Sequence, residues 1–269
     1  MNVKKMSRLL MLVFVAVLCS YLNFSDVKAE EVNKAQVGEG EFIPDPEMER
    51  LIEKKEMEME QYLAEKSKNA RASTQNCIHG ILQSPQETGS WCAYSSMRSI
   101  LLYEGFPLTQ SRIVNEISGV TGYTYDFSGQ GCPWLMVHGD DISQFPAAVY
   151  LNSKLGMFEY APYPYGPAGA TQLDPVQIRA RVVYSIDMGK GVLVNGVSQG
   201  GQSGYIPYYP TGYIGHWIVV RGYRESGNVV DVVDPVASSA VGWGANVPPY
   251  YTLELDKITG FAQAKGIMY

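Results

Sequence analysis

The amino-acid sequence predicts an α+β fold, with helices in the first part of the folded domain and an antiparallel sheet in the second. Apolar residues recur at helical spacing in several stretches before residue 189, and short runs rich in Val, Ile and Tyr dominate after it. Helices and strands that are segregated along the chain are typical of α+β domains. Residues 74–269 form one domain, since this length buries a core of its own.

Three or four helices are expected first, over residues 92–103, 109–117, 143–155 and 175–188. The last one is the best marked, because Asp174 is a favourable N-cap, Pro175 occupies the first helical position and Gly189 follows its end. Strands are expected over residues 192–197, 216–223, 228–233 and 250–255. The middle two strands form a hairpin, because a turn-forming stretch joins them.

Two further segments precede this domain. Residues 1–29 have the pattern of a secretory signal peptide: Lys4, Lys5 and Arg8 precede an apolar run that is too short for a membrane span, and cleavage is expected after Ala29. The protein is therefore expected to be secreted. Residues 74–269 contain 14 acidic and 10 basic residues, and this excess of negative charge with the lack of basic clusters argues against nucleic acid or a membrane surface as partners.

Residues 30–73 are acidic and differ in composition from residues 74–269. Apolar residues recur there at helical spacing, so a helix with an apolar stripe is expected. One interpretation is a propeptide that lies across the catalytic cleft until it is removed at the linker 69–73. The alternative, a charged surface linker or arm, is equally compatible with the pattern.

Cys92 is the strongest candidate for chemistry. It stands at the start of an expected helix, where unpaired N–H groups favour the thiolate that attacks carbonyl carbon. His216 lies near a strand start on the apolar face, and Asp234 ends the next strand on the inward face, with Asp231 on the other. A base and an orienting carboxylate are what a Cys nucleophile requires. Gln86, six residues before Cys92, is expected to hold an oxyanion together with the Cys92 N–H.

Other combinations of residues are weaker. His79 and His138 are the remaining histidines, and a single His beside carboxylates is a poor metal signature, so neither a metal nor a cofactor is expected. Of the four cysteines, Cys77 and Cys132 remain once the nucleophile is set aside and Cys19 is removed with the signal peptide. In an exported protein they are expected to form a disulfide, although unpaired thiols are the alternative.

The segment from Gln86 to Cys92, followed by Ala-Tyr-Ser, resembles the active-site segment of papain-like cysteine peptidases. Residues 215–223 with Asp234-Pro235 after them resemble the bacteriocin-processing (double-glycine) peptidase-like branch and the related effector cysteine proteases. The resemblance covers nearly all of 74–269. It implies a papain-like fold with a central helix carrying Cys92, a Cys92–His216 ion pair, Asp234 as orienter and Gln86 as oxyanion donor. Trp91 departs from the pattern, because papain has its Trp after the Cys.

These observations predict a secreted cysteine peptidase made as a zymogen and acting on protein or peptide substrates. A cell-wall amidase or endopeptidase could use the same residues, and an inactive secreted binding protein is a further alternative. Two Tyr-rich loops, 160–165 and 205–213, are expected either to line the substrate groove or to cap the sheet edge.

Overall fold

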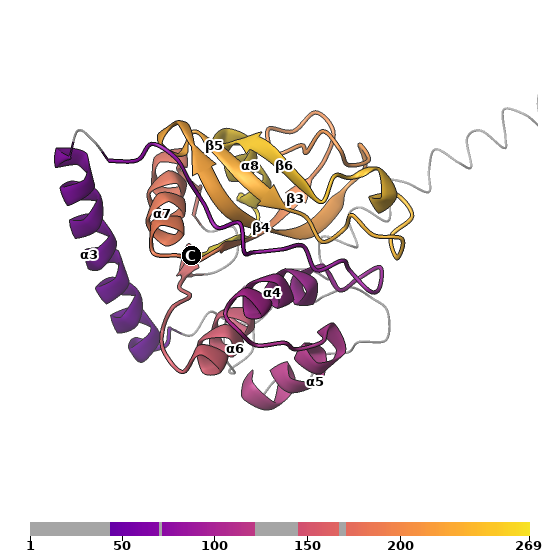
Figure 1. The fold of residues 1–269 in the computed structure, drawn as a ribbon, viewed down its shortest axis with the longest axis horizontal. Helices are drawn as coiled ribbons and strands as arrows, with labels where there is room; N and C mark the ends of the chain where they lie inside the picture. Colours follow the sequence, from indigo (N-terminus) through magenta and orange to yellow (C-terminus); the bar gives the residue numbers. More distant parts are fainter. Residues whose placement is uncertain (1–43, 70–71, 122–144, 167–170) are drawn as a thin grey trace, which may run out of the picture. The chain divides into compact units, whose positions relative to one another are not determined.

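The computed structural model describes residues 44–69, 72–121, 145–166 and 171–269 (Figure 1). Within this part of the chain, helices and strands occur in the predicted order, with the helical segments first and most of the sheet afterwards. Two helices agree almost to the residue with the ranges expected from the sequence. They are α4 at Cys92–Tyr103 and α7 at Pro175–Asp187. The Asp174 side chain caps α7 by accepting from the N–H of Val176, as its sequence position predicted.

The other helices agree with the expected segments or add to them. Helix α3 spans Pro46–Lys68, α5 spans Gln110–Thr121 and α6 spans Pro146–Leu155. Helix α8, at Leu255–Ala262, was not expected from the sequence. Short 3₁₀ turns lie at Glu225–Gly227 and Gly244–Asn246. Over the described residues, no helix is both long and apolar enough to cross a membrane.

The strands of the described chain form one antiparallel sheet in the order β2-β7-β3-β4-β5-β6, with β1 paired to β4. Its strands are β1 (Asn76–Cys77), β2 (Pro162–Tyr163), β3 (Val192–Ser198), β4 (Ile214–Arg224), β5 (Val229–Val233), β6 (Tyr250–Glu254) and β7 (Gly266–Met268). The expected hairpin is the pair β4–β5, whose register shifts between Val220 and Gly222. Strand β7 is last in chain order yet lies between β2 and β3.

The central strands are buried on both faces. Five consecutive residues of β4, from His216 to Val220, are buried, which a strand with one solvated face does not show. Helix α4 packs on β4, and α5 and α6 pack on α4 and on each other (Figure 1). Helices α7 and α8 contact each other, with α7 packed on β4 and β3 and α8 packed on β3. The core therefore fills two layers, one on each side of the sheet.

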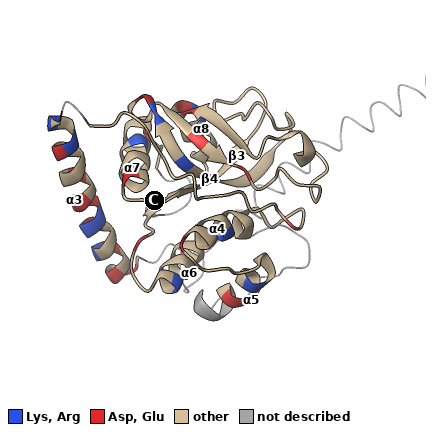
Figure 2. Cartoon of the chain, in the orientation of Figure 1, with Lys and Arg blue, Asp and Glu red and all other residues tan. Residues whose placement is uncertain are grey.

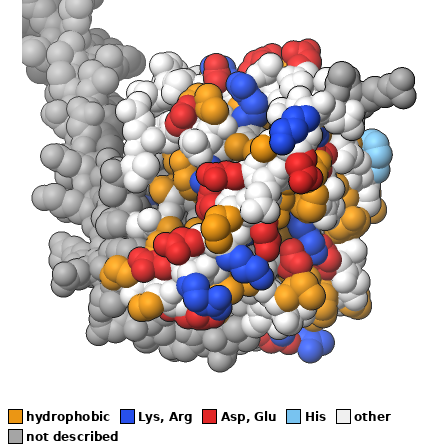
Figure 3. All heavy atoms as spheres, turned by 90° about the vertical axis from the view of Figure 1, so that its left-hand side faces the viewer, with side chains coloured by type: hydrophobic (Ala, Val, Ile, Leu, Met, Phe, Trp, Pro, Cys, Tyr) orange, Lys and Arg blue, Asp and Glu red, His pale blue; other side chains and the backbone are white. Residues whose placement is uncertain are grey.

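Charged side chains are concentrated away from this core. Helix α3 carries acidic and basic residues along its length, while β3 and β4 carry few (Figure 2). The face of the molecule that presents α3 shows both signs intermingled with apolar side chains (Figure 3). Such mixing is typical of a solvated helix that buries only one stripe.

Candidate active site

Cys92 is the first residue of α4 and is 8% exposed. The preceding residue, Trp91, caps the helix with its backbone alone, since no side-chain hydrogen bond is made there. The thiol therefore stands beside the unpaired N–H groups of the helix terminus. Because α4 packs on β4, this terminus is held against the sheet.

His216 is the third residue of β4, is 3% exposed and faces Gly196 of β3 in the strand register. Asp234 comes directly after β5 and is completely buried. The Nε2 of His216 lies 2.9 Å from the Oδ1 of Asp234. The hairpin thus brings together the two residues that the sequence had paired.

The environment of His216 favours its charged form. Burial alone lowers the pKa of this imidazole, but the Asp234 carboxylate and hydrogen bonds with Asp234 and Cys92 outweigh burial and raise it to about 10. Since Nε2 is bonded to Asp234, Nδ1 is the nitrogen left to face the thiol. The order Cys92, His216, Asp234 is therefore a continuous polar chain inside a buried site.

Asp234 is bonded to more than His216. Its Oδ1 also accepts from the N–H of Val236 at 3.0 Å, and its Oδ2 accepts from the hydroxyl groups of Tyr251, at 2.7 Å, and Tyr209. Burial raises the pKa of both tyrosines well above the ordinary value, so that both hydroxyls keep their protons. Sequence reasoning missed both roles, since nothing in the residue spacing links Tyr251 to Asp234.

Aromatic rings enclose the imidazole. Tyr209 lies edge-on to His216 with ring centroids 5.5 Å apart, and Trp243 lies 6.3 Å from His216 and 5.0 Å from Tyr209. Rings at these separations keep water from the histidine and its carboxylate partner. A low local dielectric strengthens the charge interaction between them.

Gln86 reaches the site through its backbone. Its N–H donates to the carbonyl of Pro235 at 2.8 Å, while its side-chain Nε2 donates to the carbonyl of Thr88 at 2.6 Å. The side chain is 3% exposed, and its Oε1 is buried without a hydrogen-bond partner. The described hydrogen bond of the amide is therefore to its own loop, and one Nε2 proton is left over for another acceptor.

Gln83 fastens the same loop to the sheet and was not predicted. Its Nε2 donates to the carbonyls of Asp234, at 2.9 Å, and Ala237, at 3.0 Å. The segment before Cys92 and the segment after β5 are thus tied to each other on either side of the site.

The rival residues are used elsewhere. Asp231 pairs with Arg224 at 2.7 Å. His79 contacts the sulfur of Cys77 at 3.7 Å, and Cys77 is a free thiol. The expected Cys77–Cys132 disulfide is therefore not seen, and His138 and Cys132 lie outside the described residues.

The two Tyr-rich loops lie in different places. Loop 205–213 sends Tyr209 into the site. In loop 160–165, Tyr163 stacks under the Arg181 guanidinium at 3.5 Å, and the hydroxyl of Tyr165 accepts from the N–H of Asp45 at 2.8 Å. Of the two alternatives expected for these loops, a place at the sheet edge agrees with residues 160–165, because β2 is the first strand in the sheet order and pairs only with β7.

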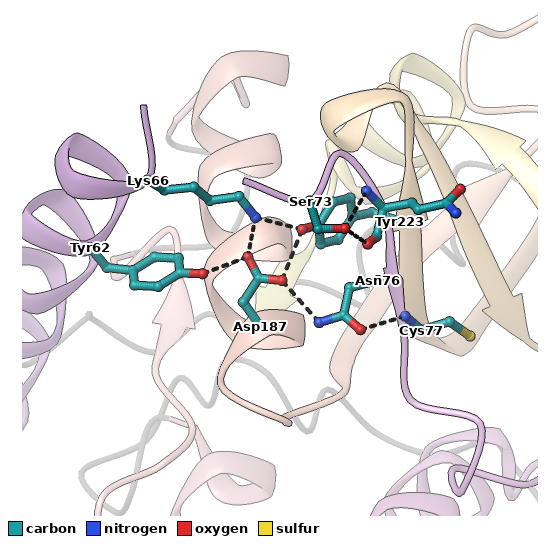
Figure 4. Close-up of polar contacts among 8 residues, drawn as sticks. Tyr62, Lys66, Ser73, Asn76, Cys77, Asp187 and Tyr223 are labelled. Carbon is teal, nitrogen blue, oxygen red and sulfur yellow. Dashed lines mark hydrogen bonds and ion pairs between the residues drawn. The ribbon is translucent and has the colours of Figure 1, made fainter. Parts of the chain in front are cut away.

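Helix α3 packs on α7 rather than over the site. Near the C-terminal end of α3, the ammonium of Lys66 donates to the carboxylate of Asp187, the last residue of α7 (Figure 4). The hydroxyl of Tyr62 donates to the same carboxylate at 2.8 Å. Cys92, His216 and Asp234 are not among the described polar partners of α3. Helix α3, the described part of the expected propeptide, therefore contacts α7 and not the catalytic residues. Residues 30–43 lie outside the described residues, and the choice between a propeptide and a charged arm stays a prediction.

Known proteins that are similar to this chain include cysteine peptidases. A model of the Peptidase C39 like family matches residues 78–248. No curated protein matches the sequence significantly. One similar solved structure is that of a putative C39-like peptidase from Bacillus anthracis, with 14% sequence identity and a TM-score of 0.42, covering 73% of this chain and 96% of that chain. Another is xylellain, a cysteine protease from Xylella fastidiosa, with 12% sequence identity and a TM-score of 0.39, covering 85% of this chain and 90% of that chain.

The family match extends over more than half of the sequence, and the described α+β architecture agrees with the papain-like fold that the sequence predicted. The matched residues 78–248 include Cys92, His216 and Asp234. The chain belongs to the Peptidase C39 like family and is a cysteine-type peptidase.

Proposed function

We propose that the protein is a secreted cysteine peptidase in which Cys92 is the nucleophile, His216 the acid and base, and Asp234 the orienting carboxylate. The observation that supports this proposal most is the buried chain of hydrogen bonds from Asp234 through His216 to Cys92. A charged imidazole at neutral pH is the partner that a thiolate requires.

In this mechanism the thiolate of Cys92 attacks the carbonyl carbon of the substrate. The backbone N–H of Cys92 and the amide of Gln86 stabilise the oxyanion, and His216 gives its proton to the leaving amine. Water then attacks the acyl-enzyme while neutral His216 accepts its proton. The carboxylate product leaves, and the thiolate–imidazolium pair is restored.

Covalent labelling by an epoxide-type thiol inhibitor tests this assignment. We expect labelling of the wild-type chain and of the matched variant Cys77→Ala, none of Cys92→Ala and slower labelling of His216→Ala. Labelling that persists in Cys92→Ala contradicts the proposed nucleophile. Zymography on casein and on cell walls identifies the substrate class, and activity on walls alone would overturn hydrolysis of proteins.

The proposal includes export and maturation. Residues 1–29 are proposed to be removed as a signal peptide, and a second cut within 69–73 is proposed to convert a zymogen into the mature enzyme. Asn69 and Ser73 are exposed, which suits a cleavage site. When the chains of the secreted, active enzyme are separated under denaturing conditions, N-terminal sequencing of the catalytic chain is expected to give a start near Ser73. A catalytic chain that starts stably at Glu30 rejects this maturation.

A further inference from the structure

We propose that Tyr209 and Tyr251 are positioning residues that fix the orientation of the Asp234 carboxylate and weaken its electrostatic attraction for the His216 imidazolium. This inference rests on the proposed function, because it concerns the same site. It assigns a task to two side chains that lie outside the Cys–His–Asp chain itself.

The two oxygens of Asp234 have different partners. Oδ1 accepts from His216, at 2.9 Å, and from the N–H of Val236, at 3.0 Å. Oδ2 accepts from both tyrosine hydroxyls, with Tyr251 at 2.7 Å. Four donors on a completely buried carboxylate leave it one orientation, in which Oδ1 points at the histidine.

The two tyrosines belong to different elements, and their side chains also hydrogen-bond to each other. Tyr251 belongs to β6, and its backbone pairs with Val232 of β5, two residues before Asp234. Tyr209 belongs to the loop before β4, where its carbonyl accepts from the hydroxyl of Tyr205 at 2.8 Å and its N–H donates to the carbonyl of Ile206. Both hydroxyls are thus held in place by their own elements rather than by the carboxylate alone.

These donors also affect charge. A hydroxyl that donates to a carboxylate draws off part of its negative charge, so that the carboxylate holds a neighbouring proton less strongly. The titratable groups that face Asp234 are His216, Tyr209 and Tyr251, and Cys92 faces His216 from α4. Removing one hydroxyl is therefore expected to raise the pKa of His216.

Titration of His216 by NMR tests this inference, since the chain has only three histidines and a His216→Ala spectrum identifies the signal. We expect the pKa of His216 to rise by about half a pH unit or more in Tyr209→Phe and in Tyr251→Phe, as loss of one charge-assisted hydrogen bond implies. Tyr223→Phe is the matched control, because its hydroxyl donates to the remote Asp187 at 2.8 Å. It is expected to leave the pKa of His216 unchanged.

An unchanged pKa of His216 in both site variants would overturn the inference and leave the tyrosines a packing role. Failure of the proposed function has a different signature. If the wild-type chain cleaves no peptide while the pKa of His216 still rises in the two variants, the positioning role stands and the peptidase assignment falls.

Discussion

Asp234 controls the charge on His216, and its replacement tests this at the scale of one residue. Because the carboxylate raises the pKa of His216 against the effect of burial, Asp234→Asn is expected to lower that pKa. The alkaline limb of kcat/KM then moves to lower pH, and kcat falls by about a hundredfold or more. Asp231→Asn is the control, since Asp231 pairs with Arg224 on the other face of β5. An alkaline limb that stays in place contradicts the prediction.

The same pKa has a consequence for stability. A group whose pKa is higher in the folded state contributes stability below its unfolded pKa and loses it as pH rises through the folded pKa. For His216 the window runs from about 6.5, the ordinary value for histidine, to about 10. We expect the free energy of unfolding to fall across this window in the wild type and less so in Asp234→Asn, as measured by denaturant unfolding.

The side chain of Gln86 donates to the carbonyl of Thr88, whereas its proposed role is to stabilise the oxyanion. If one Nε2 proton stabilises the oxyanion, Gln86→Ala is expected to lower kcat by about 10²–10³-fold with little change in KM. Gln110→Ala is the comparison, because Gln110 holds the same loop by donating to Pro85 at 2.7 Å and accepting from the N–H of Glu87. Equal losses in both variants would mean that Gln86 only shapes the loop.

At the scale of elements, a close packing of β3 on α8 supports the strand beside His216. A Cβ at Gly196, which pairs with His216, would lie 2.1 Å from the carbonyl oxygen of Phe261 in α8. Gly196→Ala is expected to destabilise the fold by about 1–3 kcal/mol, since backbone must move to admit the methyl group. Gly242→Ala is the control, as a Cβ there meets nothing within 4 Å. Urea unfolding measures both, and equal midpoints contradict the prediction.

The elements also show what the sequence could predict. Helix α7 was found because a cap, a proline and a glycine mark its ends, and the hairpin β4–β5 because two apolar runs flank a short turn. Helix α8 and strand β7 were missed, since α8 has only 8 residues and contains Gly260, and β7 has only 3. Both are stabilised by tertiary packing on β3, which no local pattern reveals.

The candidate site likewise contains residues that the sequence predicted and residues that only tertiary packing reveals. Cys92, His216 and Asp234 were predictable because each marks the end of a clearly patterned element. Tyr209 and Tyr251 were not, since their bonds to Asp234 depend on how a loop and an edge strand fold over β5. The Tyr-rich loops looked alike in composition, yet only one reaches the site.

At the scale of the whole molecule, α3 is bound to the domain by more than its linker. Lys66 reaches Asp187 and the hydroxyl of Tyr223, and Glu56 pairs with Arg181 at 2.6 Å. Burial alone would raise the pKa of Asp187, but hydrogen bonds from Lys66 and its other donors lower it, so the carboxylate keeps its charge. Loss of α3 would leave buried charges without partners, which is costly.

A cut in the linker 69–73 is therefore expected to leave α3 in place. After limited proteolysis of the full chain, the α3 fragment should co-elute with the catalytic domain in gel filtration. Lys66→Met is expected to weaken this retention, while Lys68→Met, which changes an exposed lysine in the same last turn, should not. Release of the fragment from the wild-type chain would contradict the prediction.

The position of β7 has a consequence for the timing of folding. Residues 266–268 fill the gap between β2 and β3, and β3 in turn supports the strand that carries His216. A chain that emerges from a ribosome or a translocon in order of sequence exposes Cys92 long before this gap is closed. The competent site is thus expected to form only after residues 266–268 have emerged and paired with β2 and β3. A chain that stops at residue 265 should escape the epoxide inhibitor.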